Sequence, residues 1–321
     1  MTLIKDCLDA YSSQMTKMGY RFKSSETIIR AFVNFLGGEA TLDKLTAENC
    51  SRFLYARGEK IRPTWFNQYT ALNGFFRWMR ARNLISTNPL PTDIPRRPKP
   101  RKAYIYSCEE LKRIFAAALT YQKLKRTIIP ECVQMILMLC YLLGLRRSEA
   151  LKLRVGDVDS DKRLVYVRAT KFNKSRVLTY NNQVSALIDR FLKWRSESGL
   201  PNEPDSYLFM TRRWQPMNIS CFDYTFRKVC NRAGFTRRDG ETAYARIHDL
   251  RHTFAVHRLI ACYRQGGSVQ KFLPALSVYM GHKCISHTSV YLTLTPELLS
   301  EANALFENFA QRKENENGSD K

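Results

Sequence analysis

The sequence contains no hydrophobic run long enough to cross a lipid bilayer. Its longest apolar stretch, from Val133 to Leu145, is interrupted by Gln134. The first residues, from Met1 to Asp6, lack the charged and apolar blocks of a signal peptide. These absences argue against a membrane protein and favour a cytoplasmic one.

The sequence also lacks any cysteine pattern typical of disulfides or of zinc ligands. Its nine cysteines are odd in number and irregular in spacing, and none forms a Cys-x-x-Cys pair. We therefore expect most of them to be small core residues in a reducing compartment. No metal site and no cofactor are expected.

Acidic residues are scarce beside basic ones. There are 52 Lys and Arg against 29 Asp and Glu, which gives a net charge of +23. A field of this sign attracts polyanions, so nucleic acid is the favoured partner. A basic housekeeping protein or a membrane-surface binder are the alternatives. The length of 321 residues allows two domains, and the hydrophobic content of 44% is ordinary for a globular protein.

Residues 1–95 are predicted to form a helical domain, with breaks at Gly37-Gly38 and Arg62-Pro63. Its last helix has an apolar stripe at three- and four-residue spacing, which predicts a buried face. That stripe is Trp65, Tyr69, Leu72, Phe76 and Met79.

Basic residues at the end of this domain are candidates for DNA contact. Arg77 and Arg80 lie off the apolar stripe, where DNA contact and simple solvation are both open. Residues 96–106 are predicted to be a linker, because proline at this density blocks helix and keeps the chain extended. The basic linker residues can follow a phosphate backbone, or the linker is a solvated tether. They are Arg96, Arg97, Lys99, Arg101 and Lys102.

A second domain is predicted over residues 107–312, followed by a disordered polar tail at 313–321. Ser107 and Glu110 have the spacing of a capping box for a helix that runs through Ala118.

An apolar helix is predicted to follow at 131–143, ended by Gly144. Residues 164–167 and 176–180 are predicted as two strands of a hairpin, with Lys171 in their connection. The expected fold is mainly α with a small antiparallel β-sheet.

Two arginines of the second domain are candidates for holding one phosphate. They are Arg146, in Gly-Leu-Arg-Arg-Ser-Glu, and Arg251, in His-Asp-Leu-Arg. A phosphodiester repels nucleophiles with its own negative charge, which an enzyme must neutralise as the reaction proceeds. Arginine suits this task because its planar fork donates two parallel hydrogen bonds and stays charged.

Other side chains can supply the nucleophile and move protons. Tyr291 can attack phosphorus, but its hydroxyl, with an ordinary pKa of about 10, needs a base or a positive field. His248 is the candidate base, and Lys171 the candidate proton donor to the departing 5′ oxygen. His282 can donate a hydrogen bond to the phosphate. Each signal is weak alone, but together their order and spacing favour breaking and rejoining DNA without metal or ATP.

These motifs resemble those of the tyrosine recombinase and integrase family. Residues 144–149 resemble its first arginine box, and residues 248–255 are a close match to its second. Lys171 matches its hairpin lysine, and Gly281-His282 followed by Tyr291 reproduces the spacing to its nucleophile. The helix that ends in Phe75-Phe76-Arg77-Trp78 resembles the last helix of its core-binding domain. The likeness covers nearly the whole chain.

The resemblance implies a C-shaped clamp on duplex DNA, made of a core-binding domain (1–95) and a catalytic domain (107–312). Tyr291 would attack a phosphate and leave a 3′-phosphotyrosine bond with a free 5′ hydroxyl. That bond conserves the energy needed for rejoining. Glu149 would orient the arginines. Strands would exchange through a Holliday junction in a tetramer.

The sequence departs from the family pattern in two ways. The interval from Arg251 to His282 is longer than in simpler members, which is more like the integrases of transposons and other mobile elements. Integration or excision of such an element is therefore expected, with accessory proteins as further partners. Helices start almost at Met1, so no arm-site domain is expected. A C-terminal helix at 296–311 is expected to dock on a neighbouring subunit, the alternative being its own domain.

Two other functions remain open. A type IB topoisomerase-like enzyme uses the same chemistry without strand exchange, and a DNA-binding protein without catalysis would bind but not cleave. The C-terminal helix favours recombination, and the complete residue set argues against an inert binder. His252 and His257 are expected to be structural, and His287 could be either.

Overall fold

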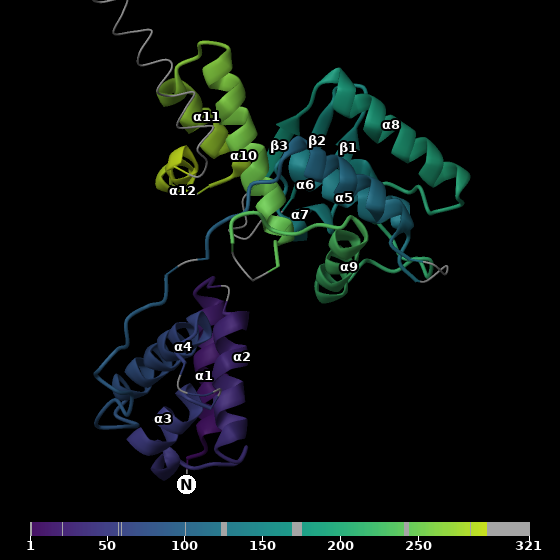
Figure 1. Cartoon of the computed structure of the whole chain (residues 1–321). Coiled ribbons are helices and arrows are strands. Elements are labelled where there is room, and N and C mark those ends of the chain that lie inside the picture. The colour runs from purple at the N-terminus through teal and green to yellow at the C-terminus, as the bar shows by residue number, and fades with distance from the viewer. Residues whose placement is uncertain are drawn as a thin grey trace, which may run out of the picture. The chain divides into compact units, whose positions relative to one another are not determined.

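The computed structural model describes residues 2–20, 22–56, 58, 60–99, 101–122, 127–168, 175–240, 244–282 and 284–293 (Figure 1). The chain divides into two compact units, residues 1–101 and 102–321. Helices dominate both, and the second also holds a small antiparallel sheet, so the expected fold class is confirmed. Within the described ranges, no helix combines the length and the hydrophobicity that a bilayer crossing requires.

The first unit is a helical bundle. Its described elements are α1 (Ile4–Lys17), α2 (Lys23–Phe35), the 3-10 helix η1 (Leu42–Lys44), α3 (Ala47–Leu54) and α4 (Pro63–Arg80). Pro63 begins α4, where its missing N–H costs nothing because the first turn leaves that position unbonded.

The predicted stripe of α4 forms much of the bundle core. Trp65, Leu72, Phe76 and Met79 are buried, and Tyr69 is half-buried with its hydroxyl donating to the Pro91 carbonyl at 3.2 Å. The apolar stripe therefore predicted the buried face of α4 correctly.

The second unit contains most of the helices. They are α5 (Cys108–Thr120), α6 (Pro130–Leu142), α7 (Arg147–Ala150), η2 (Val155–Asp157), α8 (Asn182–Glu197), α9 (Ile219–Arg232), α10 (Ile247–Arg264), α11 (Val269–Met280), α12 (Ser286–Ser289) and η3 (Val290–Thr293). The predicted capping box is present, because Ser107 and Glu110 exchange hydrogen bonds at the start of α5. Helix α6 is apolar on nearly all sides and packs between α5 and α10.

The sheet has the order β1 (Val158–Asp159), β2 (Leu164–Val167) and β3 (Arg176–Thr179), all antiparallel. In the predicted hairpin, Leu164 pairs with Thr179 and Val167 with Arg176. Strand β1 was not predicted, because two residues are too few to show an alternating pattern. Lys171, the helix at 296–311 and the tail at 313–321 lie outside the described residues.

Candidate active site

Arg146 is fixed at the start of α7 by two partners. Its backbone N–H and its Nη1 donate to the two carboxylate oxygens of Glu149, at 2.9 and 2.7 Å. Its Nη2 donates to the carbonyl of Gly281 at 2.8 Å. The side chain keeps 20% of its surface exposed, so the guanidinium is held in place yet accessible.

Glu149 lies at the centre of an arginine cluster. Its side chain is only 5% exposed, and Arg176 on β3 donates to both of its oxygens, at 2.9 and 2.8 Å. Nη1 of Arg251 lies 4.0 Å away. Burial acts to raise the pKa of this carboxyl, but the bonds and charge of Arg176 and the bonds from Arg146 outweigh it and lower the pKa to about 2. Glu149 is therefore an anion throughout the neutral range.

Arg251 is held inside the protein by backbone carbonyls. Its guanidinium donates from Nη1 to Gly144 and from Nη2 to Met280, and the residue is 1% exposed. Burial, followed by the charge of Arg146, lowers its pKa, but a guanidinium remains protonated at neutral pH. Three arginines around one carboxylate leave the cluster with an excess of positive charge.

Two glycines allow this packing. Gly144 and Gly281 both have left-handed backbone conformations, with φ of +59° and +66°. A Cβ at Gly144 would lie 2.6 Å from the ring of Phe254, and one at Gly281 would lie 3.2 Å from Nη1 of Arg176. The carbonyls of the same two glycines accept from Arg251 and Arg146, so both positions need glycine for shape and for conformation.

Tyr291 reaches the same region from η3. It is 3% exposed, and its hydroxyl lies 3.1 Å from Nδ1 of His252. Burial raises the pKa of Tyr291, while the charges of Arg251 and Arg146 act against that rise. Burial and the charges of Arg246 and Arg251 lower the pKa of His252 to about 4, so its ring is neutral at pH 7.

The two histidines of α10 lie at different distances from Tyr291. His248 was the expected base and His252 the expected structural residue, but it is His252 that contacts Tyr291. The ring of His248 meets the ring of His252 edge to face, with centroids 4.6 Å apart. Partial burial of its ring, then His252 and Arg251, lower the pKa of His248.

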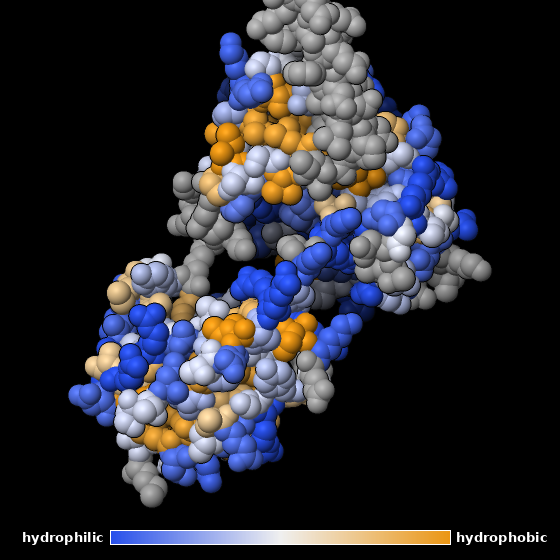
Figure 2. Space-filling model, turned by 60° about the vertical axis from the view of Figure 1, so that its left-hand side comes forward, coloured by the Kyte–Doolittle hydropathy of each residue, from blue (hydrophilic) through white to orange (hydrophobic). Residues whose placement is uncertain are grey.

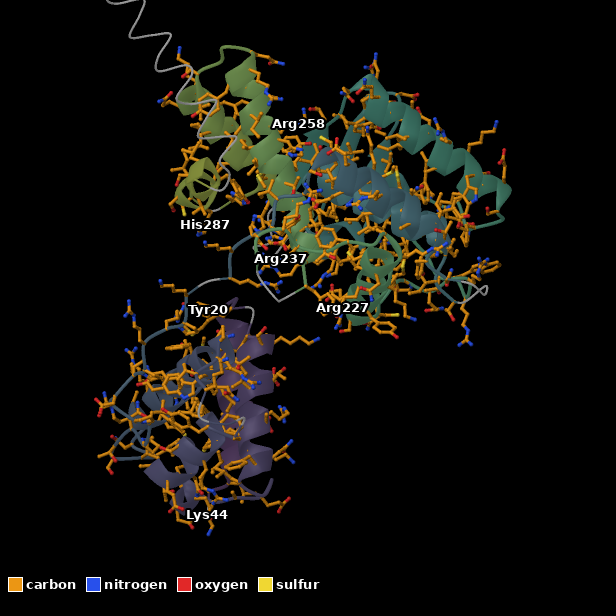
Figure 3. The ribbon with its side chains drawn as sticks, viewed as in Figure 1. Tyr20, Lys44, Arg227, Arg237, Arg258 and His287 are labelled. Atoms are coloured by element: carbon orange, nitrogen blue, oxygen red, sulfur yellow. The ribbon has the colours of Figure 1, made fainter. Side chains whose placement is uncertain are left out.

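His282 follows directly after Gly281. Its backbone N–H donates to the Ser277 carbonyl at 3.0 Å, and its Nδ1 lies 2.7 Å from the hydroxyl of buried Thr288. Its ring centroid lies 6.2 Å from that of Tyr291. Burial, then Arg251 and Arg146, lower its pKa to about 4. His287 on α12 is exposed and its ring lies 6.2 Å from that of His282 (Figure 3).

The structure thus brings together most of the residues expected from the sequence. The described members of the site are Arg146, Glu149, His248, Arg251, His282 and Tyr291. Arg176 was missed because a basic residue at a strand end gives no signal of its own. His252 could have been found, because residues four apart share one face of a helix and His248 marked that face.

The candidate DNA-contacting residues lie outside this cluster. Arg77, Arg80, Arg96, Arg97, Lys99 and Lys102 are exposed, and Arg101 is half-buried. The guanidinium of Arg97 lies 4.8 Å from the ring of Phe66, so this residue has a packing contact as well. Exposure fits DNA contact and solvation equally.

A family model described as "Phage integrase family" matches residues 107–297. This is more than half of the chain. The chain belongs to the phage integrase family.

Relatives of this integrase chain include a Sinorhizobium fredii protein named as an integrase/recombinase. It is 28% identical over 307 residues, which is 94% of this chain and 96% of the relative. The tyrosine recombinase XerC of Lactobacillus delbrueckii subsp. bulgaricus is 23% identical over 266 residues, which is 82% of this chain and 83% of the relative.

Solved integrase structures share the fold. The Tn1549 transposon integrase in complex with transposon right end DNA has a TM-score of 0.64 at 17% identity, over 95% of this chain and 99% of that one. A lambda integrase tetramer bound to a Holliday junction has a TM-score of 0.65 at 17% identity, over 90% and 77%.

Proposed function

We propose that this integrase is a site-specific DNA recombinase that cleaves and rejoins DNA through a 3′-phosphotyrosyl intermediate. The observation that carries the proposal is the 3.1 Å contact between the Tyr291 hydroxyl and Nδ1 of His252, because it pairs a nucleophile with an imidazole that accepts the proton when its own proton is on Nε2. The three-arginine cluster lies in the same unit and supplies the positive charge that a phosphodiester transition state needs.

The proposed reaction begins when the oxygen of Tyr291 attacks phosphorus. Its proton passes to Nδ1 of His252, and the bond from phosphorus to the 5′ oxygen breaks. Lys171 is the proposed donor of the proton that the departing oxygen takes up. Rejoining is the same reaction in reverse, with a 5′ hydroxyl attacking the phosphotyrosine.

The two arginines that would bind the phosphate are Arg146 and Arg251. Their bonds to protein acceptors use one N–H of each nitrogen involved, and every Nη carries two. The remaining N–H groups are the ones proposed to bind the non-bridging oxygens. His282 uses Nδ1 for Thr288, so Nε2 is the nitrogen proposed to meet the phosphate.

We further propose that both units contact duplex DNA as a clamp, with residues 1–95 as the core-binding domain, 96–106 as the linker and 107–312 as the catalytic domain. The net charge of +23 supports a partner with a phosphate backbone. The exposed basic residues of α4 and the linker are the proposed backbone contacts, and Arg101 joins them from a half-buried position.

A groove on the second unit supports assembly into a tetramer. It has a volume of about 490 Å³ and lies between the ends of α6 and β3 and the helices α10 and α11, with Phe254, Arg258, Phe272, Ala275 and Leu276 among its lining residues. Hydrophobic side chains also gather on the surface over α10 and α11 (Figure 2). We propose that the apolar face of the segment 296–311 of a neighbouring subunit fills this groove.

The proposed setting is a mobile genetic element in a prokaryotic cytoplasm, with integration or excision as the outcome and accessory proteins of the same element as further partners. The likeness in fold to a transposon integrase supports this setting. All nine cysteines are free, which fits a reducing compartment.

Strand exchange between two DNA fragments tests the proposal. Each fragment would carry one end of the native element, and the products would be joined across the two sites. Hybrid products are expected from the wild type and not from Arg146→Ala. Relaxation of a supercoiled plasmid without hybrid products would point to a topoisomerase-like enzyme. Salt-sensitive binding without any cleavage would point to an inert DNA-binding protein.

A further inference from the structure

Arg176 is a half-buried arginine that no sequence motif singled out. It is the first residue of β3, directly after the connection that carries Lys171, and its side chain is 12% exposed. Each of its three guanidinium nitrogens donates to a protein acceptor. Nη1 and Nη2 donate to Glu149, and Nε donates to the carbonyl of Tyr279 at 3.0 Å. Arg176 therefore joins the hairpin, α7 and the end of α11.

The end of α11 presents three consecutive carbonyls, and each accepts from a different arginine. Tyr279 accepts from Arg176, Met280 from Arg251, and Gly281 from Arg146. The last carbonyls of a helix have no partner within the helix and carry partial negative charge. Guanidinium groups satisfy them, so the end of this helix sets the spacing of the whole arginine cluster.

The two-pronged bond to Glu149 fixes that carboxylate in position and in rotation. A planar guanidinium matches a carboxylate with two parallel bonds, which a single donor cannot do. Glu149 then holds the backbone and Nη1 of Arg146. Without Arg176, this buried anion would lose two of its donors and would rely on Arg146 and Arg251 alone.

We propose that Arg176 is a positioning residue for strand cleavage. It holds Glu149 and the end of α11 so that Arg146 and Arg251 meet the substrate phosphate in the correct geometry. The same bonds tie the hairpin that carries Lys171 to the arginine pair. This inference rests on the proposed recombinase function, and it adds a residue that acts through others without touching the DNA.

The first test measures cleavage and binding separately. Arg176→Gln is expected to lower the single-turnover cleavage rate at saturating DNA by about 10- to 100-fold, because misplaced arginines lose transition-state stabilisation. Its affinity for DNA, measured in the Tyr291→Phe background, is expected to stay within about 2-fold, because the phosphate contacts remain. Arg176→Lys keeps the charge but not the fork, so an intermediate rate is expected.

Arg168→Gln is the matched control. Arg168 directly follows Val167, the cross-strand partner of Arg176, but its side chain pairs with Asp157 and not with Glu149. Wild-type cleavage is expected from this variant. Wild-type cleavage from Arg176→Gln would overturn the inference while leaving the recombinase function intact.

A double-mutant cycle tests whether Arg176 acts through Glu149. If it does, Arg176→Gln combined with Glu149→Gln cleaves no more slowly than the slower single variant. Multiplied losses would contradict the coupling. A purely structural role would lower the melting temperature but leave cleavage unchanged at temperatures where the variant is folded.

A second readout does not depend on cleavage. Arg176 helps to hold the pKa of Glu149 below its ordinary value, so it stabilises the fold above the unfolded pKa of about 4.3 and less as the pH falls. The difference in melting temperature between wild type and Arg176→Gln should narrow as the pH falls from about 4.3 toward about 2, and should not narrow in the Glu149→Gln background. An unchanged difference would contradict the inference even if the wild type cleaved no DNA.

Discussion

Nδ1 of His252 lies 3.1 Å from the hydroxyl of Tyr291, so the proposed nucleophile is paired with the second histidine of the His-Asp-Leu-Arg-His motif. His248, the first histidine, contacts the ring of His252. Both sit on one face of α10, because four residues make about one helical turn. The helix thereby places two neutral imidazoles and the buried Arg251 in one neighbourhood.

Replacing His252 by alanine should slow strand cleavage. A positioned general base contributes about 100-fold or more, so a loss of this order is expected in single-turnover cleavage. His257→Ala is the control, since His257 lies on the same helix but contacts Tyr141 at 2.9 Å. Equal rates for His252→Ala and wild type would remove His252 from the reaction and return the role of base to His248.

The protein should lose stability as the pH falls below neutral. Burial lowers the pKa of His252 and of His282 to about 4, while an unfolded histidine titrates near its ordinary value of about 6.5. Between these values the unfolded chain binds more protons, so the free energy of unfolding declines from about pH 6.5 toward pH 4.

Thermal or urea unfolding at several pH values measures this slope. In the double variant His252→Gln/His282→Gln, the free energy of unfolding should fall less steeply with decreasing pH than in wild type. The variant His287→Gln should match wild type, because His287 is exposed. An identical slope in wild type and the double variant would contradict the burial of these rings as the cause.

Gly281→Ala should slow strand cleavage by more than the strain of its backbone conformation alone explains. An alanine at φ of +66° costs about 1–2 kcal/mol, and its Cβ would lie 3.2 Å from Nη1 of Arg176. Gly266→Ala is the matched control, because φ is +68° there and no atom lies within 4 Å of the added Cβ. The two variants are expected to have similar melting temperatures. Only Gly281→Ala is expected to cleave DNA more slowly than wild type. Equal cleavage by both would show that the Arg176 contact does not matter.

Ala275→Glu should block assembly on DNA. Ala275 is an exposed residue that lines the groove between α10 and α11, so a carboxylate there would oppose an apolar helix. Val278→Glu is the control, because Val278 is 76% exposed on the same helix and does not line the groove. Sizing of DNA-bound complexes should show fewer tetramers for Ala275→Glu, with single-site binding retained. Unchanged tetramers would contradict docking in this groove.

Much of the fold could be predicted from local sequence patterns. The stripe of α4, the capping box of α5 and the hairpin of β2 and β3 all depend on residues a few positions apart. Strand β1 could not be predicted, because its two residues adopt strand conformation only through their pairing with β2.

Several residues of the candidate site could be predicted from the sequence, but the hydrogen bonds between them could not. Arg146 and Arg251 stood in recognisable motifs, whereas Arg176 matters only because the fold brings it to Glu149, which is 27 residues away in sequence. The pairing of Tyr291 with His252 likewise depends on how η3 packs against α10. The role of Lys171 and the docking of the segment 296–311 stay predictions.

Covalent trapping tests the central claim most directly. Purified protein would be mixed with nicked suicide duplexes from the ends of its native element and separated on a denaturing gel. A slow-migrating band is expected from wild type and from Tyr263→Phe, a tyrosine of the same apolar cluster, but not from Tyr291→Phe. An undiminished band from Tyr291→Phe would contradict Tyr291 as the nucleophile and with it the proposed mechanism.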